Sequence, residues 1–114
     1  MTDVKPLIQK YVAAWNERDA DARRALLDAV WSTGATYTDP VFHAENQAEL
    51  DAVIGRFLAD NPGASFTLHD PVDCHHHHVR FYWTLNLASG ATLPGMDYGE
   101  ITADGKLAKI VGFF

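Results

Sequence analysis

The stretch HHVRFYWTLNLASGATLPGMDYGEITADGKLAKIVGFF, residues 77–114, decides the fold class because it combines strand patterns with turn signals. Its spacing predicts strands over residues 77–87, 96–102 and 107–114, joined by turns at residues 88–90 and 104–105. In the first of these strands, Val79, Phe81 and Trp83 alternate with polar or aromatic residues, so one face suits a core or pocket and the other suits water or a partner subunit. The C-terminal part of the chain is therefore predicted to be antiparallel sheet.

Helical periodicity is confined to the first half of the chain. Apolar residues at the spacing of one helical face predict three helices, over residues 4–15, 19–29 and 46–60. The expected N-cap is Thr2 or Asp3 for the first helix, Asp19 or Asp21 for the second, and Asn46 for the third. The first two helices are expected to form a hairpin.

Shorter signals place the remaining strands. Residues 32–34 are predicted to form a turn, residues 35–38 a short strand that stops at Asp39-Pro40, and residues 65–72 another strand. Helices thus come first in the sequence and most strands come last. This segregation favours an α+β domain, in which an antiparallel sheet folds over a helical layer, and argues against alternating βαβ units.

Composition narrows the class of protein and its partners. With 114 residues and 47% hydrophobic content, the chain is long enough for a single domain, residues 1–114, with one core. Its net charge of −6 and its nine Lys and Arg residues leave no basic surface for nucleic acid. It has neither a bilayer-length apolar run nor a signal-peptide pattern, and its lone Cys74 cannot form an internal disulfide, so we expect a soluble cytoplasmic protein without a membrane partner.

Three potentially reactive side chains interrupt apolar stretches that are far apart in the sequence. Tyr11 lies on the apolar face of the first predicted helix, Asp39 lies in YTDPVF at residues 37–42, and Asp97 lies in LPGMDY at residues 93–98. Burial among hydrophobic neighbours raises the pKa of a carboxyl group, which then serves as a general base or a hydrogen-bond donor near neutral pH. Together these side chains predict a functional pocket.

Four segments resemble a known family. KYVAAWN at residues 10–16, followed by Asp19, resembles the first helix of ketosteroid isomerases and of the wider nuclear-transport-factor-2-like (NTF2-like), SnoaL-like superfamily. TDPV at residues 38–41 and GMDY at residues 95–98 resemble the stretches that carry the base and the second oxyanion donor of that isomerase, and residues 99–114 resemble the terminal hairpin of SnoaL-like domains. The resemblance implies an NTF2-like cone, in which three N-terminal helices pack on a strongly curved antiparallel sheet around a deep apolar pocket. It also implies a homodimer formed through the outer face of the sheet.

The same resemblance implies a proton-transfer site. Asp39 would be the catalytic base, and Tyr11 and a protonated Asp97 would donate hydrogen bonds to the oxyanion of the substrate. Removing a proton next to a carbonyl group places charge on its oxygen, and preorganised donors in a dry site stabilise that charge. The expected reaction is an isomerisation or aldol-type cyclisation of a small hydrophobic carbonyl compound, with neither a metal nor an organic cofactor.

Large side chains supply candidate contacts for this substrate. Trp15 lies one turn beyond Tyr11 and is expected to narrow the pocket. The candidate substrate-binding residues are Trp15, Phe57, Phe81, Trp83, His77 and Phe114. For the aromatic residues of the strands, periodicity does not separate pocket lining from core.

Each signal also has a purely structural interpretation. A tyrosine on an amphipathic helix is usually a core residue, Asp39 before Pro40 is typical of an Asx-turn, and Asp97 can be an exposed strand residue. The corresponding alternative function is a non-catalytic ligand-binding or dimerisation module. A second enzymatic alternative is epoxide opening by an activated water, which uses an arginine between two carboxylates in relatives of this fold, whereas Arg80 is predicted to face outward.

The run His75-His76-His77-His78 raises the question of a metal site. Adjacent residues of a strand face opposite sides, so at most two of these histidines share a face, whereas structural zinc takes four ligands. We therefore predict a hairpin turn near residues 73–75 with solvated histidines and no metal, in which His77 can still face the pocket.

Overall fold

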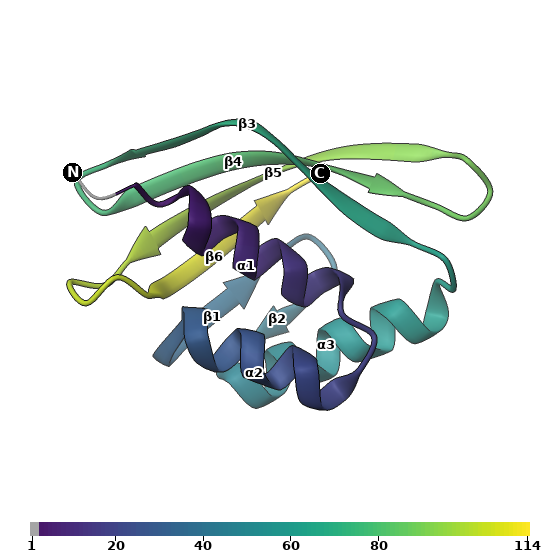
Figure 1. Ribbon diagram of the computed structural model, residues 1–114, viewed down its shortest axis with the longest axis horizontal. Coiled ribbons are helices and arrows are strands. Elements are labelled where there is room, and N and C mark those ends of the chain that lie inside the picture. The colour runs from purple at the N-terminus through teal and green to yellow at the C-terminus, as the bar shows by residue number, and fades with distance from the viewer. Residues whose placement is uncertain (1–2) are drawn as a thin grey trace.

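Three helices lie on one side of a six-stranded sheet in the computed structural model, which describes residues 3–114. The elements in chain order are α1 (Lys5–Asn16), α2 (Ala20–Val30), β1 (Trp31–Thr38), β2 (His43–Ala44), α3 (Gln47–Asp60), β3 (Ser65–His75), β4 (His78–Asn86), β5 (Thr92–Ile101) and β6 (Leu107–Phe113). Figure 1 shows the long strands β3 to β6 arching over α1, while β1 and β2 lie close to α2 and α3. The predicted α+β cone, with helices first and a curved sheet over them, is thus the fold of the chain.

The second and third helices begin at the N-caps that the sequence predicts. The side chain of Asp19 accepts a hydrogen bond from the backbone N of Ala22 at 2.8 Å, and that of Asn46 accepts one from the backbone N of Glu49 at 2.9 Å. Each bond satisfies a backbone N–H group that the start of a helix leaves without an intrahelical partner. Among the described residues, no helix is long and apolar enough to cross a membrane.

The first helix begins differently from the prediction. Its N-cap is Val4, which makes no side-chain capping bond, while Asp3 accepts a bond from the backbone N of Lys5 at 3.0 Å. Pro6 lies in the first turn, where its lack of an N–H group removes one of the donors that would otherwise need a partner. The other predicted cap, Thr2, lies outside the described residues.

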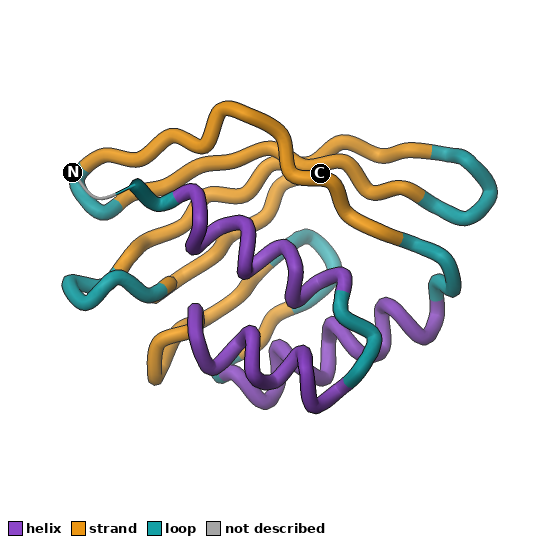
Figure 2. The backbone as a smooth tube through the Cα atoms, in the orientation of Figure 1, coloured by secondary structure: helices purple, strands orange, loops and turns teal. Residues whose placement is uncertain are grey.

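The sheet has the strand order β2-β1-β6-β5-β4-β3. Its neighbours pair antiparallel except β1 and β6, which run parallel with Tyr37 opposite Ile110. β6 therefore lies between β1 and β5, which places the end of the chain beside the strand that precedes Asp39. One helix, α3, and the strands β2 to β5 separate β1 from β6 in sequence, as Figure 2 lets the reader follow, so local patterns do not reveal this parallel pair.

Several strand boundaries differ from the predictions: β5 begins at Thr92 instead of residue 96, and β2 was not predicted. Two other differences involve positive-φ residues. β1 begins at Trp31, and Gly34, with φ of 81°, forms an irregularity within this strand instead of the predicted turn at residues 32–34. β3 extends to His75, so the tight turn to β4 consists of His76 and His77, whose φ values of 49° and 66° are those of a two-residue hairpin turn.

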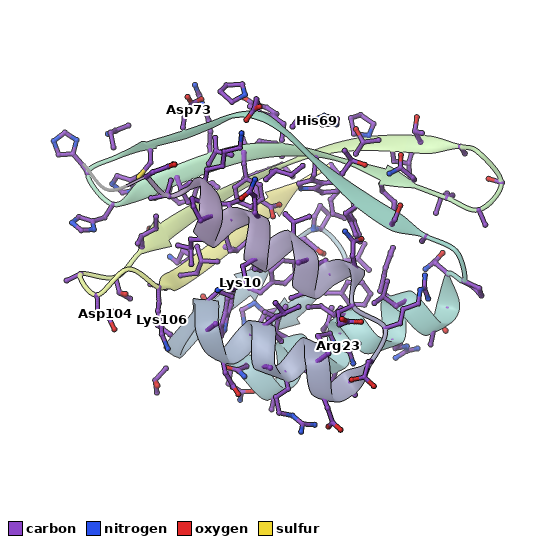
Figure 3. The ribbon with its side chains drawn as sticks, in the orientation of Figure 1. Lys10, Arg23, His69, Asp73, Asp104 and Lys106 are labelled. Carbon is purple, nitrogen blue, oxygen red and sulfur yellow. The ribbon has the colours of Figure 1, made fainter. Side chains whose placement is uncertain are left out.

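The core lies between the helices and the concave face of the sheet. Fully buried side chains from both layers meet there, including Ile8, Leu27, Leu50, Ile54, Phe81, Leu107 and Ile110. A charged residue, Arg23 of α2 (labelled in Figure 3), is also buried, and its Nε donates to Oδ1 of Asp51 on α3 at 2.5 Å. Its Nη1 donates to the backbone oxygen of Glu17 at 2.7 Å, so this buried cation joins the helices through satisfied bonds.

Candidate active site

A cavity of about 280 Å³ lies between helix residues and the concave face of the sheet. Its lining residues are Tyr11, Val12, Trp15, Tyr37, Asp39, Val41, Phe42, Phe57, Asp60, Asn61, Phe66, Phe81, Trp83, Leu85, Leu93, Asp97 and Phe114. Most are apolar, and the volume is near the lower end of small-molecule sites, which range from roughly 300 to 1,000 Å³. The cavity therefore suits a small hydrophobic molecule that meets a few polar groups.

Tyr11 of α1 supplies a hydroxyl group to this cavity. The side chain is 1% exposed, its ring stacks on Trp31 with centroids 5.9 Å apart, and its edge contact with Phe81 is at 6.2 Å. Nε1 of Trp15 donates to the Tyr11 hydroxyl oxygen at 3.0 Å, which leaves the hydroxyl proton free for another acceptor. Burial, followed by the charge of Asp97, raises the pKa of Tyr11 well above its usual value, so this hydroxyl remains a neutral donor.

Asp97 of β5 is a buried carboxyl group without a cationic partner among the described residues. It is 5% exposed, and Nε1 of Trp83 donates to its Oδ1 at 3.1 Å. Burial raises the pKa of Asp97 to about 7; the bond from Trp83 acts in the opposite direction, and the charge of Asp39 adds to the increase. Near neutral pH a large fraction of this carboxyl group is therefore protonated and able to donate a hydrogen bond.

Asp39 follows β1 and accepts hydrogen bonds on both of its oxygens. Its Oδ1 accepts from the backbone N of Val41 at 2.8 Å and of Phe42 at 2.7 Å, which is the predicted Asx-type turn. Its Oδ2 accepts from the hydroxyl of Tyr37, which is 5% exposed. Asp39 is thus both the structural residue of the turn and a group that lines the cavity.

Gly112 of β6 explains how the two carboxyl groups come together. It pairs with Asp97 on β5, and β6 also pairs with β1, which leads into Asp39. A Cβ atom at Gly112 would lie 2.9 Å from Oδ1 of Asp97, 3.3 Å from Cβ of Asp39 and 3.8 Å from the hydroxyl oxygen of Tyr37. The missing side chain therefore leaves the space in which these groups converge.

Comparisons with known proteins show the family of this chain. The sequence profile of the SnoaL-like domain family matches residues 8–110. The chain belongs to this SnoaL-like family. A presumed isomerase of the SnoaL-like family from Agrobacterium tumefaciens has a similar solved structure, with 33% identity, a TM-score of 0.91, and coverage of 99% of this chain and 97% of that chain. No functionally curated protein matches significantly.

More distant solved structures are similar to the SnoaL-like chain in fold. An NTF2-like protein of unknown function from Cytophaga hutchinsonii has a TM-score of 0.73 and 13% identity, covering all of this chain and 91% of that one. A presumed SnoaL-like polyketide cyclase from Jannaschia has a TM-score of 0.71 and 13% identity, covering 99% of this chain and 88% of that one. The resemblance to SnoaL-like and NTF2-like proteins, inferred from short motifs, is confirmed.

The SnoaL-like fold brings the three candidate catalytic residues to one cavity, since Tyr11, Asp39 and Asp97 all line it. Of the six candidate substrate-binding residues, five also line it, namely Trp15, Phe57, Phe81, Trp83 and Phe114. The prediction that His77 faces the pocket is wrong. This residue is exposed in the turn between β3 and β4, because β4 begins one residue later than predicted.

Two sets of lining residues were not predicted. Tyr37 is the most informative, and its signal was its position two residues before Asp39, which places both side chains on one face of an extended segment. The others are apolar residues at the mouth: Val41 is 66% exposed and Leu93 52%, and both line the cavity beside the predicted Phe114, which is 61% exposed. No local pattern shows that the loop after β1 lies near the β4–β5 hairpin.

The charged groups of the outer sheet face are separate from the cavity. Arg80 faces outward as predicted, and its Nε contacts Oδ2 of Asp73 at 3.1 Å. Figure 3 shows Asp73 and His69 on the side of the sheet away from the helices. Among the described residues, no arginine lines the cavity, so the arginine that epoxide opening requires is not part of this site.

The remaining histidines of the run lie at the end of the β3–β4 hairpin. Nδ1 of His75 is 3.0 Å from Nδ1 of His76, and Nδ1 of His78 is 2.6 Å from the hydroxyl of Tyr98. Within residues 3–114, no three potential metal ligands converge in a way that could hold an ion. These histidines are exposed and none of them lines the cavity.

Proposed function

We propose that this SnoaL-like protein catalyses a proton transfer without a cofactor, in an isomerisation or aldol-type cyclisation of a small hydrophobic carbonyl compound. The observation that carries the proposal is the meeting of two neutral donors, Tyr11 and protonated Asp97, with the carboxyl group of Asp39 in an apolar cavity. The descriptions of two structural neighbours, a presumed isomerase and a presumed polyketide cyclase, support the same class of reaction.

The proposed reaction begins with the carboxylate of Asp39 taking a proton from the carbon next to the carbonyl group. The electrons of that C–H bond move to the carbonyl oxygen, where Tyr11 and Asp97 donate hydrogen bonds to the developing charge. In an isomerisation, Asp39 returns the proton to a different carbon of the enolate. In a cyclisation, the enolate carbon forms a bond to a second carbonyl carbon, and the new alkoxide takes the proton.

The cavity favours an uncharged substrate. Its acidic lining residues are Asp39, Asp60 and Asp97, and no basic residue lines it within the described part of the chain. A carboxylate or phosphate on the substrate would lack a cationic partner and would be repelled by these groups. The exposed apolar residues at the mouth, Val41, Leu93 and Phe114, offer additional contact to a hydrophobic substituent.

A probe reaction tests the base without knowledge of the natural substrate. The bicyclic ketone 2-tetralone has acidic α-protons, and their exchange for deuterium can be followed by NMR. Asp39→Asn is expected to slow the catalysed exchange by about 10² to 10⁴-fold, the usual contribution of a general base. The exposed Asp21→Asn serves as the matched control, and a folded Asp39→Asn variant that exchanges at the wild-type rate would refute the assignment.

A binding measurement tests the donors separately. Flat phenols such as 2-naphthol mimic the enolate, and their binding can be followed by thermal shift. Tyr11→Phe and Asp97→Asn are each expected to weaken binding, by about tenfold if one hydrogen bond to a charged oxygen is lost. If both variants bind 2-naphthol as tightly as the wild type does, the proposed oxyanion site is refuted.

The alternative function is a ligand-binding module without catalysis. One observation favours it: the bonds to Oδ1 of Asp39 close the loop through Val41 and Phe42, which gives this aspartate a structural role. A module of this kind would bind apolar ligands but would not accelerate exchange of the ketone. The exchange assay therefore distinguishes the two functions.

We also propose a homodimer formed through the outer face of the sheet. Two exposed aromatic residues, Tyr82 at 40% and Phe113 at 55%, lie on strands of this sheet and are more exposed than such residues usually are. Sedimentation of the wild-type protein and of a Phe113→Glu variant tests this arrangement, since a charge in the interface is expected to give monomers.

A further inference from the structure

We propose that Tyr37 is a positioning residue for Asp39, whose hydroxyl fixes the rotation of the carboxylate so that one lone pair of Oδ2 remains for the substrate proton. This inference rests on the proposed role of Asp39 as the base. It gives a function to a tyrosine that lies two residues before the base and lines the same cavity.

The hydrogen bonds of Asp39 identify the oxygen that can accept a proton. A carboxylate offers about four lone-pair sites, two on each oxygen. Both sites of Oδ1 are occupied by the backbone N–H groups of Val41 and Phe42, at 2.8 and 2.7 Å. Tyr37 occupies one site of Oδ2, so a single site on Oδ2 is left. The proton therefore moves from the substrate carbon to Oδ2 and later returns from it.

The Tyr37 side chain is held firmly enough to orient its neighbour. It is 5% exposed, its ring packs against Trp15 with centroids 5.5 Å apart, and its backbone pairs with Ile110 of β6. Burial raises the pKa of Tyr37 far above its usual value, so the hydroxyl keeps its proton and remains a donor. Because two rigid strands and a tryptophan fix the ring, the hydroxyl can restrict the carboxylate to one rotation.

The turn after β1 does not explain the Tyr37 bond. An Asx-type turn requires a side-chain oxygen that accepts from the following backbone, and Oδ1 fulfils that role for Val41 and Phe42. Tyr37 binds the opposite oxygen, Oδ2, and adds no bond to the loop. Its bond therefore acts on the orientation of the carboxylate, which is a property that proton transfer needs.

The first test is the Tyr37→Phe variant in the ketone exchange assay. We expect kcat to fall by about tenfold or more, because a bond to a charged oxygen is lost, while KM changes by less than about twofold, because the ring remains. Tyr98→Phe, which removes a hydroxyl that contacts His78 and Glu100 outside the cavity, is the matched control and is expected to leave both constants unchanged. A Tyr37→Phe variant with wild-type kcat would overturn the inference.

A double variant distinguishes positioning from a general structural role. In the Asp39→Asn background, Tyr37→Phe is expected to have no further effect on the residual exchange rate, since it acts through the base. The same fold-loss in both backgrounds would overturn the inference. If Tyr37→Phe does not fold, fluorinated tyrosines, whose hydroxyl groups are more acidic, replace Tyr37. A kcat that does not change with the acidity of that hydroxyl would also overturn the inference.

The two proposals fail in different ways. If Asp39→Asn exchanges as fast as the wild type, or if the wild type does not exchange the ketone, the proposed function fails and the role of Tyr37 fails with it. If Asp39→Asn is inactive while Tyr37→Phe is fully active, only the role of Tyr37 is refuted.

Discussion

The molecule buries two polar clusters, one between its helices and one in its cavity, and they are built in opposite ways. Arg23 is 6% exposed and Asp97 is 5% exposed, so both lie well away from water. The guanidinium of Arg23 has an anionic partner, Asp51, and a backbone carbonyl acceptor. Asp97 has one donor, Trp83, and no cation bonds to it among the described residues.

This difference separates a group that stabilises the fold from a group that we propose takes part in the reaction. A buried charge with a counter-ion and satisfied hydrogen bonds keeps its ordinary protonation state and joins the elements around it. A buried carboxyl group without a cation is shifted toward its neutral form, and its ionised form destabilises the folded state. The cavity therefore carries a cost in stability that the helix interface does not, as is typical of active sites.

The largest expected effect comes from removing the charge of Asp97. Its pKa is raised to about 7 in the folded protein, whereas an unfolded aspartate titrates near 3.9. Between these two values the unfolded chain has lost the proton and the folded chain keeps it, so the free energy of unfolding falls as pH rises. Above about pH 7 the loss reaches its full value, on the order of 4 kcal/mol.

Asp97→Asn is thus expected to resemble the wild type in stability near pH 4. At pH 8 its free energy of unfolding is expected to exceed that of the wild type by up to about 4 kcal/mol. Urea unfolding at several pH values measures the difference, with m-values compared to exclude a change in the unfolded state. The exposed Asp21→Asn is the control, and its stability is expected to depend on pH as that of the wild type does, because it keeps Asp97. Equal pH profiles for Asp97→Asn and the wild type would mean that the cavity does not shift this carboxyl group.

The next largest effect is expected in the helix cluster. Arg23→Met leaves the carboxylate of Asp51, which is 22% exposed, without its cation, and such a change is expected to lower the free energy of unfolding by about 3 kcal/mol. The double variant Arg23→Met with Asp51→Leu is expected to regain most of this loss, because no unpaired charge remains. Binding of 2-naphthol by the folded fraction is expected to be unchanged, and a loss of binding would show that the two clusters are coupled.

The helices and the α+β class follow from the sequence because both depend on local chemistry. The caps Asp19 and Asn46 and the apolar spacing of each helix act within a few residues, and so does the alternation that defines β4. The parallel pairing of β1 with β6 depends on contacts between distant segments, and no local period encodes it. The β3–β4 turn was misplaced because His76 and His77 adopt positive φ, which sequence signals reserve mainly for glycine and asparagine.

The candidate site was only partly predictable for the same physical reason. Tyr11, Asp39 and Asp97 could be identified because each is a polar interruption of an apolar pattern and each matches a family motif. Tyr37 meets neither criterion, because tyrosine is common in strands and no family motif was matched at this residue. Its hydrogen bond to Asp39 is seen only in the structure. The role of Gly112 depends on what lies on the two strands beside it, so the sequence around it does not reveal that role.

The smallest effect is expected from a matched pair of added methyl groups, one in each cluster. A Cβ at Gly55 of α3 would lie 2.9 Å from Nη2 of Arg23, and a Cβ at Gly112 would lie 2.9 Å from Oδ1 of Asp97. Arg23 ends in a long flexible side chain that can move aside, and alanine is favoured over glycine inside a helix by about 1 kcal/mol, so Gly55→Ala is expected to be neutral or slightly stabilising.

Gly112→Ala meets a more rigid surrounding, because its new methyl group also lies 3.3 Å from Cβ of Asp39, and neither aspartate is long enough to bend away. We expect it to lower the free energy of unfolding by about 1–2 kcal/mol, as overpacking does, and to weaken 2-naphthol binding by separating the carboxyl groups. Urea unfolding and ligand titration of both variants measure this difference. If Gly112→Ala binds 2-naphthol as well as Gly55→Ala does, the absence of a side chain at residue 112 is not required for the arrangement of the two carboxyl groups that binds the phenol.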